Sequence, residues 1–227
     1  MPRDVRNPVL ASLACALMLI PVVVLAYAFG PGERLDGSIF SHLAAHDSGA
    51  GHALAVGVGS LGDLLPVLAM LALIVTIGLA AGRGRQALAA VVIVVGAGLT
   101  TQVLKHLLSH PRFQGEFLGL DHPWANSFPS GHTTAAASLA AALLFVVPPR
   151  LRPVAAGLGA TFTTAMGIAV VVLQWHYPSD VVGALLVVGS WSFVALAALR
   201  LLRPRGPASP PRERRESSSG RFAISLQ

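Results

Sequence analysis

Six long apolar runs dominate the sequence and constrain the fold more than any other feature. A bilayer core about 30 Å thick needs roughly 20 apolar residues per helix, and the runs have about that length, the fourth being somewhat short. The composition agrees, because 54% of the residues are hydrophobic, 11% are charged and the mean hydropathy is +0.68. We therefore predict an all-α, six-transmembrane-helix bundle with helices near residues 8–29, 61–80, 87–108, 132–147, 154–173 and 181–202.

The chain divides into one predicted membrane domain, residues 1–203, and a C-terminal tail, residues 204–227. The tail is rich in Pro, Ser and charge and cannot bury enough apolar surface to fold. We expect it to be a disordered cytoplasmic extension that can contact anionic lipid headgroups. The sequence Ala26-Tyr27-Ala28 resembles a signal-peptidase site, but its apolar run exceeds the roughly 7 to 15 residues of a signal peptide, so we expect this helix to be retained.

Arginine placement predicts the orientation of the bundle. If six helices alternate in direction, four segments lie on the same side of the membrane, and most of the arginines are in them. These segments precede the first helix, join the second to the third and the fourth to the fifth, and follow the sixth. Because cytoplasmic segments carry the excess of Lys and Arg, we predict a multi-pass plasma (inner) membrane protein with both termini in the cytoplasm. The extracytoplasmic side then receives residues 30–60, 109–131 and 174–180. Every candidate functional group lies in these segments or at the helix ends next to them.

Composition argues against several functions. The net charge is +6, but the basic residues are split among short segments and form no face with aromatic residues, so no nucleic-acid partner is expected. Cys15 is the single cysteine and lies in an apolar run, which gives no disulfide framework and no cysteine metal site. His42 and His46, with His52 nearby, could meet a zinc ion, but a loop rich in Gly and Ala is a poor rigid site. We predict no metal and no cofactor.

Residues 126–134 read N-S-F-P-S-G-H-T-T and predict a helix start with affinity for anions. Pro129 disfavours helix at the residue before it, Ser130 is a good N-cap, and Gly131 lets backbone approach a ligand closely. The N–H groups of such a helix start bind anions. His132, in the first turn, can give or take a proton near neutral pH. The motif indicates a phosphate site with an acid beside it, although an ordinary capped helix with an interfacial histidine would have the same sequence.

Two further polar elements fall on the same predicted membrane side. Lys105 and Arg112 bracket the end of the third helix; the lysine there snorkels or has an anionic partner, and the planar fork of the arginine suits two phosphate oxygens. His176 and Asp180 lie four residues apart around Pro178. A carboxylate within reach of one imidazole nitrogen would fix the tautomer and leave the other nitrogen exposed as a nucleophile.

Three motifs of the chain resemble, in order and over successive helices, the signature motifs of the type 2 phosphatidic acid phosphatase (PAP2) superfamily: Lys105-x6-Arg112, Pro129-Ser130-Gly131-His132 and His176-x3-Asp180. The resemblance covers about residues 61–202 and implies a PAP2-like core within the bundle. It also implies roles for single residues: phosphate binding by Lys105, Arg112, Ser130 and Gly131, protonation of the leaving oxygen by His132, attack on phosphorus by His176, and orientation of that imidazole by Asp180. In the family no metal is needed.

The third motif departs from the family pattern. The family usually has Ser-Arg ahead of the nucleophile, with the arginine six residues before it, and this chain has Ala169 and Val170 at those positions. Gln174 falls four residues after Val170, would share its helical face, and is a candidate to donate a neutral hydrogen bond to phosphate instead. A charge-assisted bond is roughly twice as strong as a neutral one, so we expect weaker transition-state stabilisation or a substrate with different phosphate needs.

The resemblance predicts a metal-independent phosphatase. It would remove a phosphate from a lipid phosphate or prenyl pyrophosphate at the extracytoplasmic membrane face, through a phosphohistidine intermediate. The expected partners are that substrate and membrane lipids. Two alternatives stay open: a lipid phosphotransferase that passes the phosphoryl group to an alcohol other than water, and a non-catalytic lipid-phosphate-binding membrane protein, which Val170 favours.

Overall fold

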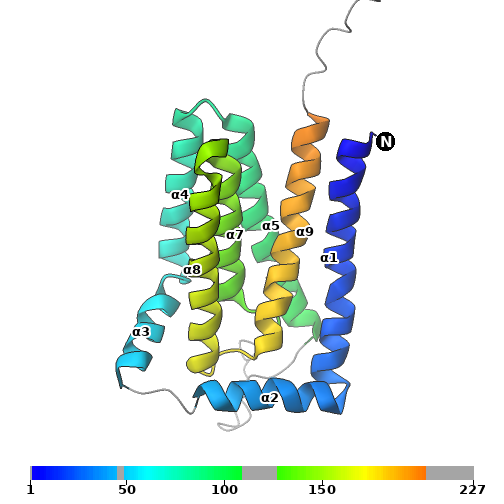
Figure 1. Cartoon of the computed structure of the whole chain (residues 1–227), viewed down its shortest axis with the longest axis vertical. Helices are drawn as coiled ribbons and strands as arrows, with labels where there is room; N and C mark the ends of the chain where they lie inside the picture. Colours follow the sequence, from blue (N-terminus) through cyan, green and yellow to red (C-terminus); the bar gives the residue numbers. More distant parts are fainter. Residues whose placement is uncertain (1, 45–48, 109–126, 203–227) are drawn as a thin grey trace, which may run out of the picture.

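The structure is a computed structural model that describes residues 2–44, 49–108 and 127–202. Within these ranges the chain forms helices joined by short turns (Figure 1). Three predictions concern residues outside them: Arg112 as a phosphate ligand, His46 in the alternative zinc pair, and the disordered tail. The elements are α1 (Arg3–Tyr27), α2 (Gly30–Ala44), α3 (Gly49–Ser60), α4 (Leu64–Ala80), α5 (Gly84–Leu108), α7 (Gly131–Val146), the short 3-10 helix η1 (Pro149–Leu151), α8 (Arg152–Val172) and α9 (Pro178–Leu201).

The predicted all-α membrane bundle is confirmed. In the described part of the chain α1, α5, α8 with η1, and α9 are long and apolar enough to cross a membrane, and α3 with α4 qualifies as one segment bent by 56°. The remaining predicted span is the shorter apolar helix α7, of 16 residues. The six predicted segments therefore correspond to α1, α4, α5, α7, α8 and α9, and the bent pair adds α3 in front of the second of them.

The first outer segment was predicted as a loop, and this is wrong for residues 30–44 and 49–60, which are helical. Helix α2 lies across one end of the bundle (Figure 1). Its charged residues exclude it from a span, but Phe40 is buried against α8 residues such as Met166. An amphipathic helix of this kind can lie along a membrane interface, a possibility that the glycine content of the segment concealed.

Helix α7 occupies the centre of the bundle and packs against α4, α5, α8 and α9. Its small residues make this possible, because Ala136 and Ala142 are almost completely buried and small side chains let membrane helices approach closely. Gly159 of α8 acts in the same way, since a Cβ there would lie 2.7 Å from the Cβ of Ala140. The close packing fixes the start of α7 between the end of α5 and the start of α9.

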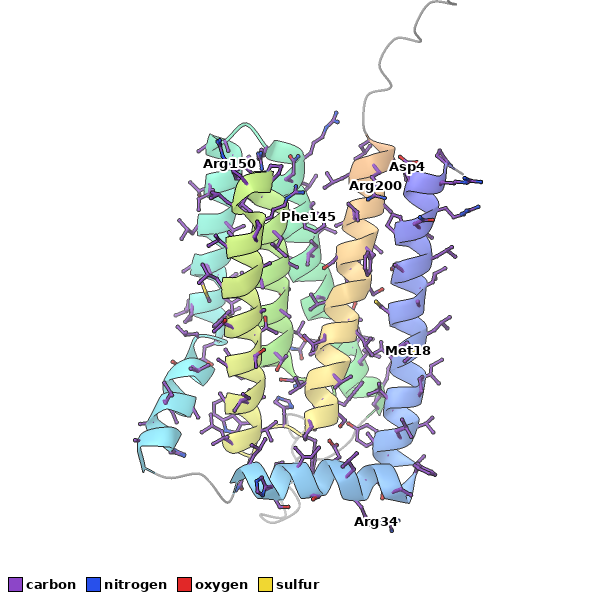
Figure 2. The ribbon with its side chains drawn as sticks, in the orientation of Figure 1. Asp4, Met18, Arg34, Phe145, Arg150 and Arg200 are labelled. Carbon is purple, nitrogen blue, oxygen red and sulfur yellow. The ribbon has the colours of Figure 1, made fainter. Side chains whose placement is uncertain are left out.

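Most of the arginines in the described ranges lie at the end of the bundle where α1 begins and α9 finishes (Figures 1 and 2). Arg83 donates to the carbonyl oxygen of Val146 at 2.8 Å, and Arg85 donates to that of Leu202 at 2.7 Å. Arg200 donates to the carbonyl oxygen of Asp4. The structure thus collects these segments at one end, as the topology prediction requires, and the side of the membrane to which that end belongs stays a prediction.

Candidate active site

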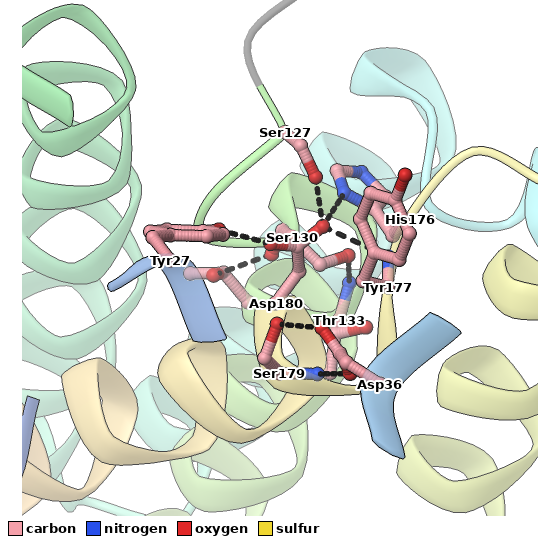
Figure 3. Close-up of polar contacts among 10 residues, drawn as sticks. Tyr27, Asp36, Ser127, Ser130, Thr133, His176, Tyr177, Ser179 and Asp180 are labelled. Carbon is pink, nitrogen blue, oxygen red and sulfur yellow. Dashed lines mark hydrogen bonds and ion pairs between the residues drawn. The ribbon is translucent and has the colours of Figure 1, made fainter. Parts of the chain in front are cut away.

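The candidate site lies at the opposite end of the bundle, where α7 and α9 both begin (Figure 1), and Figure 3 shows its polar contacts. The two helix starts are tied together, because the backbone N–H of Ser130 donates to the carbonyl oxygen of Asp180 at 3.1 Å. This bond brings the second and third predicted motifs into one cluster. The sequence predicted that these motifs share a membrane side, and the structure shows that they are in direct contact.

His176 and Asp180 form a buried pair. Nδ1 of the imidazole lies 3.2 Å from Oδ2 of the carboxylate, and the two residues are 2% and 0% exposed. The expected pairing of one ring nitrogen is therefore present, whereas the expectation that the other nitrogen is exposed is wrong. His176 lies in the turn between the end of α8 at Val172 and the start of α9 at Pro178.

The carboxylate of Asp180 accepts hydrogen bonds from distant parts of the chain. Its Oδ1 accepts from the Tyr27 hydroxyl at 3.0 Å. Its Oδ2 accepts from the Ser127 hydroxyl and from the backbone N–H of Tyr177, the latter at 2.9 Å. A buried charge is tolerated when its oxygens are fully hydrogen-bonded. These donors hold the carboxylate, and through it the His176 ring, in one orientation.

Sequence reasoning missed both hydroxyl donors. Tyr27 was noticed only as part of a sequence resembling a cleavage site, and Ser127 only as part of the segment 126–134. A signal for Tyr27 existed, because a tyrosine hydroxyl at the end of an apolar run needs a polar partner when buried. The partner itself lies 153 residues further along the chain, beyond the reach of local patterns.

A second acidic residue, from the N-terminal region of the chain, holds the start of α9. Asp36 of α2 accepts from the backbone N–H of Ser179 at 2.9 Å and from its hydroxyl at 2.6 Å. The first N–H groups of a helix have no partner within the helix, so a carboxylate from another helix can serve as their cap. Asp36 was missed because its segment was predicted to be a loop.

The start of α7 has the predicted capping geometry. Ser130 is extended, with φ −64° and ψ 118°, and its hydroxyl accepts from the backbone N–H of Thr133 at 3.3 Å. Lys105 reaches the same place from the end of α5, since a Cβ added to Gly131 would lie 4.0 Å from its Nζ. An ammonium group, a buried hydroxyl and a helix N-terminus therefore lie together, and each favours an anion.

His132 lies at the edge of the site and is about one-quarter exposed. Its Nε2 is 3.5 Å from Oδ1 of Asp63, and its ring packs against Trp175 with centroids 5.1 Å apart. Gly62 is required for this arrangement, because a Cβ there would lie 2.5 Å from the imidazole. Asp63 and Trp175 were not predicted as site residues. Together the contacts orient a partly solvated imidazole that can exchange protons with water.

The structure corrects the reasoning about Gln174 and Val170. Helix α8 ends at Val172, and Gln174 adopts a left-handed backbone conformation with φ 59°, so the two residues do not share a helical face. Val170 is fully buried in an apolar cluster. Its carbonyl oxygen accepts from the N–H groups of Trp175 at 2.9 Å and His176 at 3.1 Å. A phosphate contact by Gln174 stays a prediction, and it would have to come from the turn.

The alternative zinc pair gains no support from the described residues. His42 lies near the end of α2 and His52 in α3. No group of three or more His, Cys, Asp or Glu side chains able to hold a metal ion occurs within the part of the chain that the structure describes.

The fold and the site together define a multi-pass membrane protein with a buried His–Asp pair at one end of its helix bundle. The model of the PAP2 superfamily matches residues 86–203, and the chain belongs to that superfamily. The matched region contains Lys105, the α7 start and the His176–Asp180 pair. It excludes α1 to α4, and therefore Tyr27 and Asp36.

Curated relatives match a shorter stretch. The chain is 37% identical over 87 residues to phosphatidylglycerophosphatase B of Escherichia coli strain K12, and the match covers 38% of this chain and 34% of the relative. The proteins of the same name from Escherichia coli O157:H7 and Shigella flexneri match equally. The matched stretch thus spans about a third of the length of these relatives.

A solved structure matches nearly the whole fold. The crystal structure of a transmembrane PAP2 type phosphatidylglycerolphosphate phosphatase from Bacillus subtilis superposes with a TM-score of 0.74 at 18% sequence identity. The superposition covers 86% of this chain and 98% of that one. At this identity the likeness establishes the shared fold.

Proposed function

We propose that this protein is a phosphatase that removes a phosphate from a lipid phosphate or prenyl pyrophosphate through a phosphohistidine intermediate. The observation that carries the proposal is the buried His176–Asp180 pair, bonded through the Asp180 carbonyl to the capped start of α7. Membership of the PAP2 superfamily and the name of the curated relatives support a lipid phosphate as substrate.

In the first step, Nε2 of His176 attacks phosphorus. Asp180 accepts a hydrogen bond from Nδ1–H, which leaves the lone pair on Nε2, and its negative charge stabilises the positive charge that the ring acquires. The N–P bond forms as the bond between phosphorus and the leaving oxygen breaks. His132 donates a proton to that oxygen, and a neutral alcohol, or the shorter phosphate from a pyrophosphate, departs.

In the second step, water replaces the histidine. His132, now neutral, accepts a proton from the water as its oxygen attacks phosphorus, and the N–P bond breaks to release inorganic phosphate and the His176 imidazole. Asp63 and Trp175 keep the His132 ring in place throughout. Each histidine thus returns to its starting state, and no external oxidant or reductant is required.

The transferring phosphate group would be held by groups that are already arranged before it binds. Ser130 and Gly131 supply a hydroxyl and a backbone N–H at the α7 start, and Lys105 supplies a positive charge beside them. Arg112 is proposed as a second cation. Because pre-arranged donors and cations stabilise the developing charge, we propose that the reaction proceeds without a metal ion, and the arginine distribution supports an extracytoplasmic location of the site.

The test is phosphate release by the purified protein from phosphatidylglycerol phosphate, phosphatidate and undecaprenyl pyrophosphate, with EDTA present throughout. We expect His176→Ala to abolish release, while His132→Ala still accumulates a phosphorylated protein from a substrate with a good leaving group. His52→Ala is the matched control, because His52 is exposed on α3, and should retain activity. An active His176→Ala protein would refute the mechanism, and phosphate transfer to an added alcohol in preference to water would identify a phosphotransferase.

A further inference from the structure

A large cavity lies at the end of the bundle opposite His176. Its volume is about 740 Å³, which falls within the range of about 300 to 1,000 Å³ that is usual for small-molecule sites. Three arginines line it, and each comes from a different helix: Arg85 from α5, Arg152 from α8 and Arg200 from α9. The proposed catalytic mechanism uses none of these residues.

The cavity carries an excess of positive charge. Asp4 is the one acid among its lining residues, and within the described ranges no carboxylate lies at salt-bridge distance from any of the three guanidinium groups. Arg85 and Arg200 each donate to one backbone carbonyl oxygen. Because a guanidinium has five N–H donors, most of the donor capacity of the three arginines remains for a bound anion.

Part of the cavity wall is apolar. Leu144 and Phe145 of α7 line one part, and Leu196 and Leu199 of α9 line another. The neighbouring Leu201 and Leu202 are 63% and 60% exposed at the end of the bundle. Since a soluble anion would gain nothing from such walls, the combination of arginines and apolar side chains suits a molecule with an anionic head and a hydrocarbon body.

We propose that this cavity binds an anionic glycerophospholipid from the leaflet at that end of the bundle. Its phosphate would be held by the forked guanidinium groups of Arg85, Arg152 and Arg200, whose planar donors match phosphate oxygens, and its glycerol and upper acyl chain would lie along the leucines and Phe145. Basic pockets between transmembrane helices are suited to such headgroups. The lipid would join α5, α8 and α9, whose opposite ends hold the candidate active site.

The test measures lipid binding to the full-length protein in detergent, independently of its catalytic activity. The purified protein is titrated with dioleoylphosphatidylglycerol and, separately, with dioleoylphosphatidylcholine, and retained lipid is counted by native mass spectrometry. Arg152→Gln should weaken retention of the anionic lipid about tenfold, because the lipid phosphate loses roughly one charge-assisted hydrogen bond. Arg150→Gln is the matched control, because Arg150 is exposed two residues away and does not line the cavity, and it should change retention by less than twofold.

Two variants with equal charge loss complete the design. Arg85→Gln/Arg152→Gln/Arg200→Gln should abolish the preference for the anionic lipid, whereas Arg3→Gln/Arg6→Gln/Arg150→Gln should keep it. Equal losses in both triple variants would show a diffuse charge effect and overturn the proposal. Competition by glycerol 3-phosphate or inorganic phosphate at the lipid concentration would also overturn it, by showing a soluble-anion site. If the first triple variant does not fold, the Arg152→Gln and Arg150→Gln pair still decides, because no hydrogen bond within the described ranges depends on the Arg152 side chain.

Discussion

The two ends of the helix bundle use charged side chains in opposite ways. At the end where α1 begins and α9 finishes, arginines such as Arg83 and Arg85 are partly or fully exposed and donate to the last carbonyl oxygens of neighbouring helices. At the other end, Asp180 is completely buried and accepts from side chains of distant segments. Exposed charges at helix ends can be replaced at little cost, whereas a buried carboxylate depends on every one of its donors.

The largest difference between the ends should appear when one acid is removed from each environment. Asp180→Ala should lower kcat by about 10³ to 10⁴, because His176 loses the group that fixes its tautomer. It should also reduce the free energy of unfolding by about 3 to 5 kcal/mol, since donors from Tyr27 and Ser127 lose their buried acceptor. Thermal unfolding and phosphate release would be measured together. Asp4→Ala, at the arginine end, should leave kcat unchanged, and an equal loss in both variants would contradict the contrast.

A new charge should be tolerated at the turn before His176 but not inside the apolar cluster behind it. Val170→Arg places an unpaired guanidinium among Phe40, Met166 and other buried side chains, and we expect it to lower the free energy of unfolding by several kcal/mol. Gln174→Arg adds the same charge two residues beyond α8 and should fold normally. Yield and melting temperature decide between the two outcomes. A stable Val170→Arg protein with raised activity would show instead that this position reaches the phosphate.

Removing the Tyr27 hydroxyl should affect catalysis more than stability alone explains. Tyr27→Phe deletes one hydrogen bond to Asp180, and we expect kcat to fall up to about tenfold with KM little changed, because the carboxylate and its imidazole become less well oriented. Ser12→Ala is the matched control, since it deletes another bond between α1 and α9, to Ser190 at 3.0 Å, remote from the site. Both variants should lose about 1 kcal/mol of stability. Equal kcat values for the two would assign Tyr27 a purely structural role.

The same contrast explains how much the sequence could predict. Six spans follow from run length against bilayer thickness, and the helix starts at Ser130 and Pro178 follow from short motifs, so the bundle and the core of the site were accessible. The contacts of Tyr27 and Asp36 were not, because their partners lie 153 and 143 residues away. Both residues also lie outside the region that matches the family model. Periodicity and local motifs carry no information about which distant helix supplies a donor.

The error at Gln174 has a different cause, the uncertainty of helix ends in sequence patterns. The apolar run continues to Leu173, so the pattern placed Gln174 on the last turn of the helix, while the chain instead leaves the helix at Val172. A left-handed residue at a helix end is usually Gly. A left-handed conformation was therefore not expected for a glutamine. Because glycine would fit this backbone better, the glutamine side chain is a candidate for a chemical role.

Replacing Gln174 by glycine separates the backbone role of this residue from its chemical role, and we expect the smallest effects here. Glycine adopts a positive φ without steric cost but loses more entropy on folding, so the free energy of unfolding should change by less than about 1 kcal/mol. If the amide donates to the transferring phosphoryl group, kcat/KM should fall about tenfold, the value of one net hydrogen bond. Gln174→Asn, which tolerates the left-handed region and keeps an amide on a shorter side chain, should retain stability and recover part of the activity. Unchanged kinetics in both variants would show that the Gln174 side chain does not contact the transferring phosphoryl group and that the turn before His176 only positions the imidazole.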